Sequence, residues 1–547
     1  MDRPGTRTSR GRRLSGRIPA LIAVVALAVS AACAPSAEKA LGSPTPEPFP
    51  TTTPTVVPTP TPTPTPTPDR RCPAPPQGGG GGEDQKGGEG GSGRLSDTGG
   101  NRVEPVGLPV TAPQDKAKPV LDLCFAFSSD RTRANGREGV TFRPDLRTCE
   151  LVFRLWPNKP DAASSGAELT ITKATVGQTE VKPTMTSAGG AKATPGTLAS
   201  LELPRCVAPG TAVTASLDFS LALGQDSEER VGYDEKADVA WAGTAFPLLA
   251  WVPGRGWARD PAVALYGETA TSTDMTLRQL VVITNTGDTV LGSGTTGAVK
   301  PGATSGTEAH TFAAPDVRDV AVTVGSVAMV ETKVGDVTVH LGLPRSGTKS
   351  TSRQWSTAIT LALRRLQAEF GRFPYRDLWV SVLPDVGGGI EFPGSVQLLD
   401  LEPARIAELT THELAHQWFY GLVGNDQGAN PWLDESFATY ATAVTLGQGR
   451  RYAAFGVPAT VRNRVGQSMS WYNALRDPQD YTAGVYYQGA KMLLAARKAT
   501  GAAKFRALTR DYITANANKI ATPASVATAY RTSPQAIALF RQYGAIG

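Results

Sequence analysis

The chain has 547 residues, which is too long for one compact domain and indicates two or three. Its formal net charge is +6, but residues 1–32 hold six arginines and one aspartate, so the remainder carries only +1. The basic composition is therefore no sign of nucleic-acid binding, and we expect no nucleic-acid partner. A stretch rich in predicted strands is followed by a stretch of mostly predicted helices, and this order predicts a multidomain α+β protein.

Residues 1–32 have the layout of an export signal peptide. Arginines up to Arg17 precede an apolar run from Ile18 to Val29, which is too short and too rich in small residues for a membrane span. The run ends in Ser30-Ala31-Ala32-Cys33, which is similar to a bacterial lipobox with Ser30 in the usual place of Leu. We predict a lipid anchor on Cys33, facing outward from the bacterial cell membrane. Plain cleavage and secretion is the alternative.

Residues 33–118 predict a disordered tether. The tract from Thr51 to Pro68 is nearly all Thr and Pro, and a Gly-rich run follows to Gly100. Because Pro-Thr repeats favour extended polyproline II, this tract alone can reach on the order of 50 Å. We expect the tether to hold a domain away from the membrane or through the cell wall.

Four cysteines follow Cys33, and an even number in an exported chain predicts two disulfides. They are Cys72, Cys124, Cys149 and Cys206, which allow three pairings. Metal binding is the weaker interpretation, because no two of them have a C-x-x-C spacing. None lies near a candidate catalytic motif, so a thiol mechanism is not expected.

Residues 119–345 predict an N-terminal β-rich domain. Four segments rich in Val, Thr and Leu are punctuated by Gly, Pro and Asp: Glu168 to Thr175, Ala212 to Leu223, Leu277 to Thr284 and Val334 to Leu343. In the last segment apolar and polar residues alternate, which places His340 on a polar face and predicts that it is solvated rather than catalytic. His310 lies near a turn and suggests no function.

Residues 346–547 predict the catalytic domain. Thr351 to Phe370 has apolar residues at helical spacing, and Leu378 to Leu383 is typical of a short strand. An H-E-x-x-H motif follows at His412-Glu413-Leu414-Ala415-His416. A helix places both histidines on one face, where they can share a metal ion, and turns Glu413 off that face to serve as general base. The alternative is a helix with two solvated histidines.

The segment Trp432-Leu433-Asp434-Glu435-Ser436-Phe437-Ala438 begins a second predicted helix. Here the sequence resembles the aminopeptidase N family of gluzincin metallopeptidases, whose ligands follow H-E-x-x-H, eighteen residues, then E. The family signature W-L-N-E-G-F-A appears with Asp434 and Ser436 as departures. The resemblance implies a thermolysin-like, mostly helical domain with a small sheet. It also implies one zinc ion per chain, bound by His412, His416 and Glu435.

The turn Gly388-Gly389-Ile390-Glu391-Phe392 precedes the helix that carries the H-E-x-x-H motif. By itself it is a glycine-rich turn before a strand. The family carries G-x-M-E-N or G-G-M-E-Y there, and its glutamate binds the free α-amino group of the substrate. The resemblance therefore implies that Glu391 pairs with a substrate ammonium, with Gly388 and Gly389 beside it in the substrate-binding turn. Ile390 and Phe392 are departures.

The family also shows Y-x-K-G-A, which is similar to Tyr486-Tyr487-Gln488-Gly489-Ala490. This resemblance implies that the Tyr486 hydroxyl faces the oxyanion of the tetrahedral intermediate. Without it, Tyr486 and Tyr487 are packing residues. Tyr481 is either a supporting ligand or a surface residue. In the N-terminal domain, Phe246 to Trp251 and Val317 to Ala321 fit the family in the expected order.

These residues predict a zinc-dependent aminopeptidase that acts on peptides outside the cell membrane. Glu413 takes the proton of the attacking water and delivers it to the leaving amine, and Tyr486 shares the oxyanion charge with zinc. Endopeptidase action, or epoxide hydrolysis as in the related leukotriene hydrolase, is one alternative. An inactive surface lipoprotein that keeps the fold as a binding module is the other.

Overall fold

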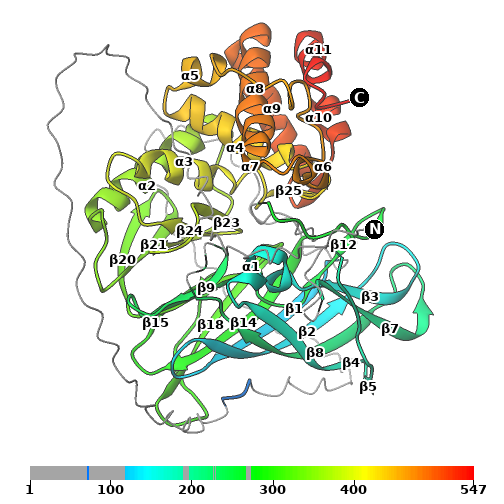
Figure 1. The fold of residues 1–547 in the computed structure, drawn as a ribbon, viewed down its shortest axis with the longest axis vertical. Coiled ribbons are helices and arrows are strands. Elements are labelled where there is room, and N and C mark those ends of the chain that lie inside the picture. The colour runs from blue at the N-terminus through cyan, green and yellow to red at the C-terminus, as the bar shows by residue number, and fades with distance from the viewer. Residues whose placement is uncertain (1–69, 73–117, 189–195, 226, 228, 266–272) are drawn as a thin grey trace, which may run out of the picture.

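The structure of the protein, a computed structural model, describes residues 70–72, 118–188, 196–225, 227, 229–265 and 273–547. A β-rich region comes first along the chain, and a mostly helical region follows it (Figure 1). The predicted multidomain α+β fold is therefore confirmed. The predicted signal peptide, Cys33 and most of the predicted tether lie outside the described residues.

A nine-stranded sheet runs through the N-terminal region, in the order β16-β18-β14-β1-β2-β8-β4-β5 with β17 paired to β18. Its strands are β1 (Val120–Phe127), β2 (Arg133–Phe142), β4 (Glu168–Val176), β5 (Thr179–Glu180), β8 (Val213–Ala222), β14 (Met275–Asn285), β16 (Thr295–Thr296), β17 (Lys300–Pro301) and β18 (Thr307–Val317). Buried residues alternate along β2 and β8, as expected for strands covered on one face. Three predicted strand segments correspond to β4, β8 and β14.

Two four-stranded sheets pack on this large sheet. One has the order β15-β19-β10-β9 and the other β11-β3-β7-β6. Their strands are β15 (Thr289–Gly292), β19 (Ala321–Gly325), β10 (Val239–Gly243), β9 (Val231–Asp234), β11 (Leu248–Leu249), β3 (Thr148–Arg154), β7 (Leu198–Val207) and β6 (Thr184–Thr186). Phe125 and Phe312 of the large sheet share a core with Trp241 of β10, while Phe142 shares another with Phe153 of β3. A hairpin of β12 (Trp251–Val252) and β13 (Gly256–Trp257), a turn of 3-10 helix (Trp156–Asn158) and α1 (Pro160–Ser164) complete the region.

Both predicted disulfides form, and the structure selects one of the three pairings. Cys72 is bonded to Cys124 of β1, and Cys149 of β3 to Cys206 of β7. The second bond joins two neighbouring strands of one small sheet. The first bond fastens a residue from the predicted tether to the nine-stranded sheet.

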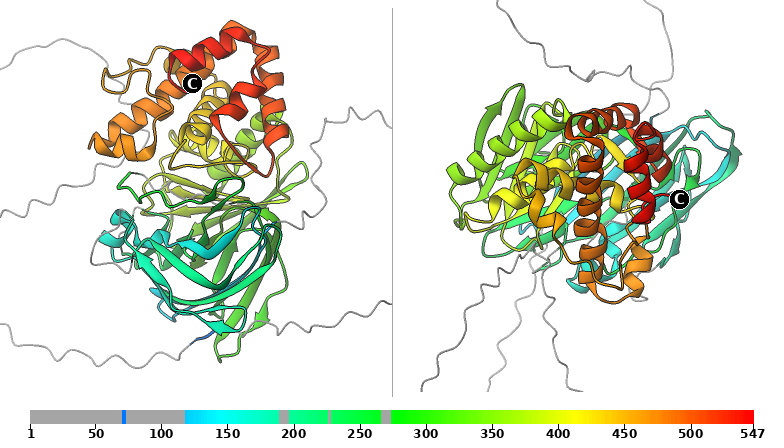
Figure 2. Two further views of the ribbon diagram at one scale, coloured as in Figure 1. Left: turned by 90° about the vertical axis from the view of Figure 1, so that its right-hand side faces the viewer. Right: turned by 90° about the horizontal axis from the view of Figure 1, so that it is seen from above.

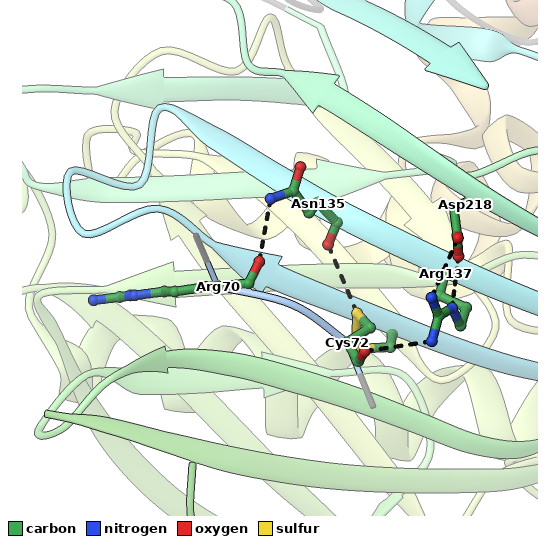
Figure 3. Close-up of a disulfide and its surroundings, with 6 residues drawn as sticks. Arg70, Cys72, Asn135, Arg137 and Asp218 are labelled. Carbon is green, nitrogen blue, oxygen red and sulfur yellow. Dashed lines mark hydrogen bonds and ion pairs between the residues drawn. A yellow bond between two sulfur atoms is a disulfide. The ribbon is translucent and has the colours of Figure 1, made fainter. Parts of the chain in front are cut away.

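The segment Arg70–Cys72 lies along β1 and β2, although it belongs to the predicted tether (Figure 3). The Asn135 side chain donates a hydrogen bond to the Arg70 carbonyl at 3.1 Å, and Arg137 donates one to the Cys72 carbonyl at 3.4 Å. The Arg70 guanidinium is buried and donates to the Phe127 carbonyl at 3.0 Å. The predicted tether is therefore attached to the domain at Cys72, 48 positions before β1 begins at Val120.

A five-stranded sheet begins the second region, in the order β20-β21-β22-β24-β23. Its strands are β20 (Val327–Val334), β21 (Val337–Pro344), β22 (Asp377–Leu383), β24 (Ser395–Leu399) and β23 (Gly389–Phe392). The predicted strands at Val334 to Leu343 and Leu378 to Leu383 correspond to β21 and β22. Because β20 and β21 pair into this sheet, the sheet starts before the domain boundary that we predict at residue 345.

His340 is not solvated, so this prediction is wrong. The side chain is buried on β21, stacked on the Trp379 ring at a centroid distance of 3.9 Å. Trp379 in turn packs on Phe312 of the N-terminal region. The polar face of β21 is covered by the other domain, so alternation along this strand does not mean exposure to water.

Helices cover the other face of the five-stranded sheet and extend away from the β-rich region (Figure 2). They are α2 (Ser352–Phe370), α3 (Ile406–Ala415), α4 (Trp432–Thr445), α5 (Gly449–Ala453), α6 (Met469–Ala474), α7 (Pro478–Tyr481), α8 (Gln488–Thr500), α9 (Ala502–Asn516), α10 (Pro523–Ala529) and α11 (Pro534–Gln542). β25 (Val423–Asn425) pairs with β26 (Lys519–Ala521). Helix α2 begins as predicted, because Thr351 and Gln354 form a capping box. Within the described ranges, no helix has the length and apolar character of a membrane span.

Candidate active site

His412 and His416 bring their ring nitrogens together at the end of α3. The two Nε2 atoms lie 3.2 Å apart. Glu435, in the first turn of α4, places Oε2 3.1 Å from Nε2 of His412 and 3.5 Å from Nε2 of His416. Three candidate ligand atoms therefore surround one point, and they belong to the three residues that the family resemblance implies as ligands.

The three atoms fit a zinc ion. Tetrahedral ligands at roughly 2.0–2.1 Å from zinc stand about 3.3 Å from one another, which matches the observed separations. Nδ1 of His416 lies 3.1 Å from the Phe419 carbonyl. Since a carbonyl only accepts, Nδ1 carries the proton and the lone pair of Nε2 faces the metal position.

The charge state of Glu435 also suits a metal ligand. Burial by itself raises the pKa of this carboxyl group, but when the histidines carry protons on Nε2, the charge of His416 and the hydrogen bonds from both rings outweigh burial and hold its pKa below the ordinary value. A cation in place of those protons favours the ionised carboxylate in the same way. Glu435 is 2% exposed. The carboxylate is therefore ionised wherever the two histidines stay beside it.

Glu413 lies beside the three ligands and is not one of them. Its side chain is buried against Gly389, where an added Cβ would lie 2.3 Å from the carboxyl carbon of Glu413. Any other residue at position 389 would therefore displace the predicted base. Burial, together with the carboxylates of Glu391 and Glu435, raises the pKa of Glu413 well above the ordinary value. A raised pKa makes this group a stronger base than an exposed glutamate.

Glu391 comes from β23, the edge strand next to the metal helix. It is 2% exposed, and its ligand atoms lie within 4.8 Å of those of Glu413 and His416. The structure thus places the predicted amine-binding carboxylate beside the predicted base. Gly388 and Gly389 are half-buried at the start of this strand.

Tyr486 faces the metal ligands, whereas Tyr487 does not. The Tyr486 ring stacks on the His412 ring with a centroid distance of 5.8 Å. Tyr487 instead contacts the Phe455 ring, 4.8 Å away. Tyr481 is fully buried with its ring 5.6 Å from that of Tyr486, so its interpretation as a surface residue is wrong.

A local irregularity turns Tyr486 toward the site. Residues Thr482–Tyr487 form a π-helical turn before α8, a feature frequent at functional sites. Ser436 of α4 donates a hydrogen bond to the Val485 carbonyl at 2.7 Å. An added Cβ on Gly489 would lie 1.9 Å from the Ser436 hydroxyl, so only glycine lets the two helices approach this closely.

Comparison with known proteins agrees with this geometry. Residues 399–542 match the Peptidase family M1 domain. This matched segment contains the three candidate ligands, Glu413 and Tyr486. The chain is 34% identical over 90 residues to aminopeptidase N of Haemonchus contortus, and 49% identical over 49 residues to an alanine/arginine aminopeptidase of Saccharomyces cerevisiae. These matches cover 14% and 8% of the chain, and only 9% and 6% of the relatives.

Solved M1 structures share the fold well beyond that segment. The M1 zinc metallopeptidase from Deinococcus radiodurans has a TM-score of 0.54 and 20% sequence identity, covering 78% of this chain and 92% of that chain. A mutant of that enzyme bound to a Tyr-Ser-Ala substrate has a TM-score of 0.55, covering 78% of this chain and 93% of its own. The fold of a β-rich region followed by a mostly helical region is therefore common to these proteins and this chain.

One buried polar residue of the matched segment was not predicted from the sequence. Gln427 lies in the loop between α3 and α4, fully buried, and its Nε2 donates hydrogen bonds to Glu391 at 3.3 Å and to Asp434 at 3.2 Å. In the sequence this stretch is a Gly- and Asn-rich turn. The one available signal was Asp434, a carboxylate where the family signature has Asn, because a buried carboxylate requires a donor.

Proposed function

We propose that this chain is a zinc-dependent aminopeptidase that hydrolyses N-terminal residues from peptides. The observation that supports this most directly is the buried Glu391 carboxylate beside the metal ligands and Glu413. A buried carboxylate needs a cationic or hydrogen-bonding partner. The free ammonium of a peptide supplies that partner, whereas an internal peptide bond does not.

The chain's own residues divide the chemistry between them. His412, His416 and Glu435 would hold the zinc ion, which would supply the Lewis acidity that activates water and polarises the scissile carbonyl. Glu413 accepts the proton of the attacking water and returns it to the leaving amine. The Tyr486 hydroxyl donates to the developing oxyanion, and one well-placed donor of this kind is worth roughly 3 kcal/mol.

The test of this proposal is a matched pair of peptides, one with a free N-terminus and one acetylated. The wild type should prefer the free peptide strongly. Glu391→Ala should raise KM for the free peptide sharply and shift the preference toward the acetylated one, because the charge-assisted contact is lost. Equal cleavage of both peptides by the wild type would favour an endopeptidase. Hydrolysis of neither, with zinc bound, would favour a binding module.

We further propose that the protein acts on the outer side of the bacterial cell membrane, anchored through lipid on Cys33. The export-like residues 1–32 and the lipobox-like Ser30-Ala31-Ala32-Cys33 support this proposal. Cys33→Ser should move the protein from the detergent phase to the aqueous phase after detergent partition. A wild-type protein already in the aqueous phase would indicate plain cleavage and secretion.

A further inference from the structure

The loop between α3 and α4 is held in place by the N-terminal domain. The Tyr420 hydroxyl donates a hydrogen bond to Asp319 Oδ2 at 3.2 Å. Arg318, the preceding residue, donates from Nε to the Gly421 carbonyl at 3.4 Å. An added Cβ on Gly424 would lie 2.1 Å from Arg318 Nη1. The two domains therefore fit closely along the residues that directly follow the metal helix.

A second contact fixes the next part of the same loop. Arg255, in the turn between β12 and β13, forms an ion pair with Asp426. Asp426 also accepts a hydrogen bond from the Ala429 backbone at 3.0 Å. Gln427 lies between these fixed points, so its backbone has little freedom to move.

The Gln427 side chain is held by the carboxyl groups of Glu391 and Asp434. Nε2 lies between Glu391 Oε1 and Asp434 Oδ2 and donates to both. The Asp434 carboxylate accepts a second hydrogen bond, at Oδ1, from the Glu435 backbone at 2.8 Å. A flipped amide would turn its oxygen toward Glu391 Oε1, and two oxygen acceptors repel each other. The amide nitrogen is therefore fixed toward Glu391.

Glu391 needs such a donor. Its carboxylate lies within 4.8 Å of Glu413, and like charges at this distance repel when they are buried. A hydrogen bond to one carboxylate oxygen offsets part of that repulsion and sets the rotation of the group. The second oxygen is then presented in a constant direction.

We propose that Gln427 is a positioning residue for substrate selection, which orients the Glu391 carboxylate toward the free ammonium of the peptide. This inference rests on the proposed aminopeptidase function and adds a residue to it. Asp434 completes the arrangement by holding the other side of the Gln427 amide. The N-terminal domain contributes indirectly, since Arg255, Arg318 and Asp319 hold the loop.

The experiment measures kcat and KM for the free and acetylated peptide pair on purified full-length variants. Gln427→Leu should raise KM for the free peptide about tenfold, the usual effect of losing one hydrogen bond to a charged group, with a smaller change in kcat. The free-to-acetyl ratio of kcat/KM should fall in parallel, with zinc content unchanged. Asp434→Asn should give a milder effect, about threefold, because an amide oxygen still accepts from Nε2.

Gln397→Leu is the matched control. Gln397 is an equally buried glutamine on β24, and no described residue makes a hydrogen bond with its side-chain amide. The control should leave the free-to-acetyl ratio unchanged. If Gln427→Leu loses zinc or has a lowered melting temperature, Gln427→Asn is the variant to measure. Its side chain is one methylene shorter and cannot reach both carboxyl groups, so its free-to-acetyl ratio of kcat/KM should also fall.

The outcomes separate this inference from the proposed function. A ratio that falls in Glu391→Ala but stays at the wild-type value in both Gln427 variants would overturn the role of Gln427 and leave the aminopeptidase proposal standing. A wild type that does not distinguish the two peptides would overturn the aminopeptidase proposal itself. An equal fall of the free-to-acetyl ratio in Gln397→Leu would also overturn the positioning role of Gln427. Substitution of any buried glutamine would then lower the ratio.

Discussion

The metal-ligand cluster and the domain junction around His340 both place imidazole beside carboxylates, but their nitrogens point differently. At the junction, Nδ1 of His340 lies 3.0 Å from Glu331 and Nε2 lies 2.9 Å from Asp377, on opposite sides of the ring. In the cluster, the two Nε2 atoms lie 3.2 Å from each other and share Glu435.

This difference distinguishes a cation-binding site from a structural contact. Each nitrogen of His340 has its own carboxylate acceptor, so the group is satisfied within the protein. In the cluster three electron-pair donors converge, which is favourable only around a positive ion. The number of nearby histidines and carboxylates does not separate the two cases, whereas the direction of the lone pairs does.

Removing the metal should have the largest effect. After treatment with a zinc chelator, hydrolysis of the free peptide should fall to background, and one equivalent of zinc should restore it. Thermal stability should fall too, because a ligand bound only by the folded state stabilises it. Full activity in metal-free protein would show that the cluster of His412, His416 and Glu435 is, like the His340 junction, a structural contact and not a catalytic metal site.

Replacing the base tests the assignments within the cluster. Glu413→Gln should keep zinc near one per chain, since this residue is not a ligand, but lower kcat by several orders of magnitude. Metal analysis together with steady-state kinetics checks both statements. Loss of zinc along with activity would show that the ligand and base assignments are wrong.

Removing one hydroxyl tests the oxyanion donor. Tyr486→Phe should lower kcat on the order of a hundredfold with little change in KM, because the contact forms mainly in the transition state. Tyr487→Phe is the matched control, and it should be much milder because that ring packs on Phe455. The reverse ranking would show that the two tyrosines have exchanged roles.

Substituting His340 at the domain junction should have the smallest effect, and it should change stability alone. His340→Gln should lower the free energy of unfolding by about 1–2 kcal/mol and leave kcat and zinc content unchanged, because the stacked ring and its charge-assisted contacts lie outside the cluster. Urea unfolding at pH 7 measures this loss. A drop in zinc content would place His340 among the ligands.

The same variant should change the pH dependence of stability. Burial by itself raises the pKa of Asp377, but hydrogen bonds with His340 and Thr295 outweigh it and hold the pKa below its ordinary value. A carboxyl group with a lowered folded-state pKa stabilises the fold above its unfolded pKa, about 4, and loses that contribution as the pH falls through the folded value. His340→Gln should flatten this acid-side loss, measured by urea unfolding between pH 5 and pH 3.

The sequence by itself predicted two metal ligands and the base. The helical period puts His412 and His416 on one face and Glu413 off it, whatever the surrounding fold. The roles of Glu435 and Tyr486 came from the resemblance to the aminopeptidase N family, and the strand and helix segments followed from the alternation and spacing of apolar residues.

Only the tertiary structure decided the contacts between distant residues. It selected the Cys72–Cys124 and Cys149–Cys206 pairings, buried His340 and Tyr481, and placed Gln427 against Glu391, 36 positions away. Local patterns report which face of an element is apolar, and they do not report what covers its polar face. At β21 and in the loop after α3 the covering surface is the N-terminal domain, so these residues are buried although their sequence is typical of exposed positions.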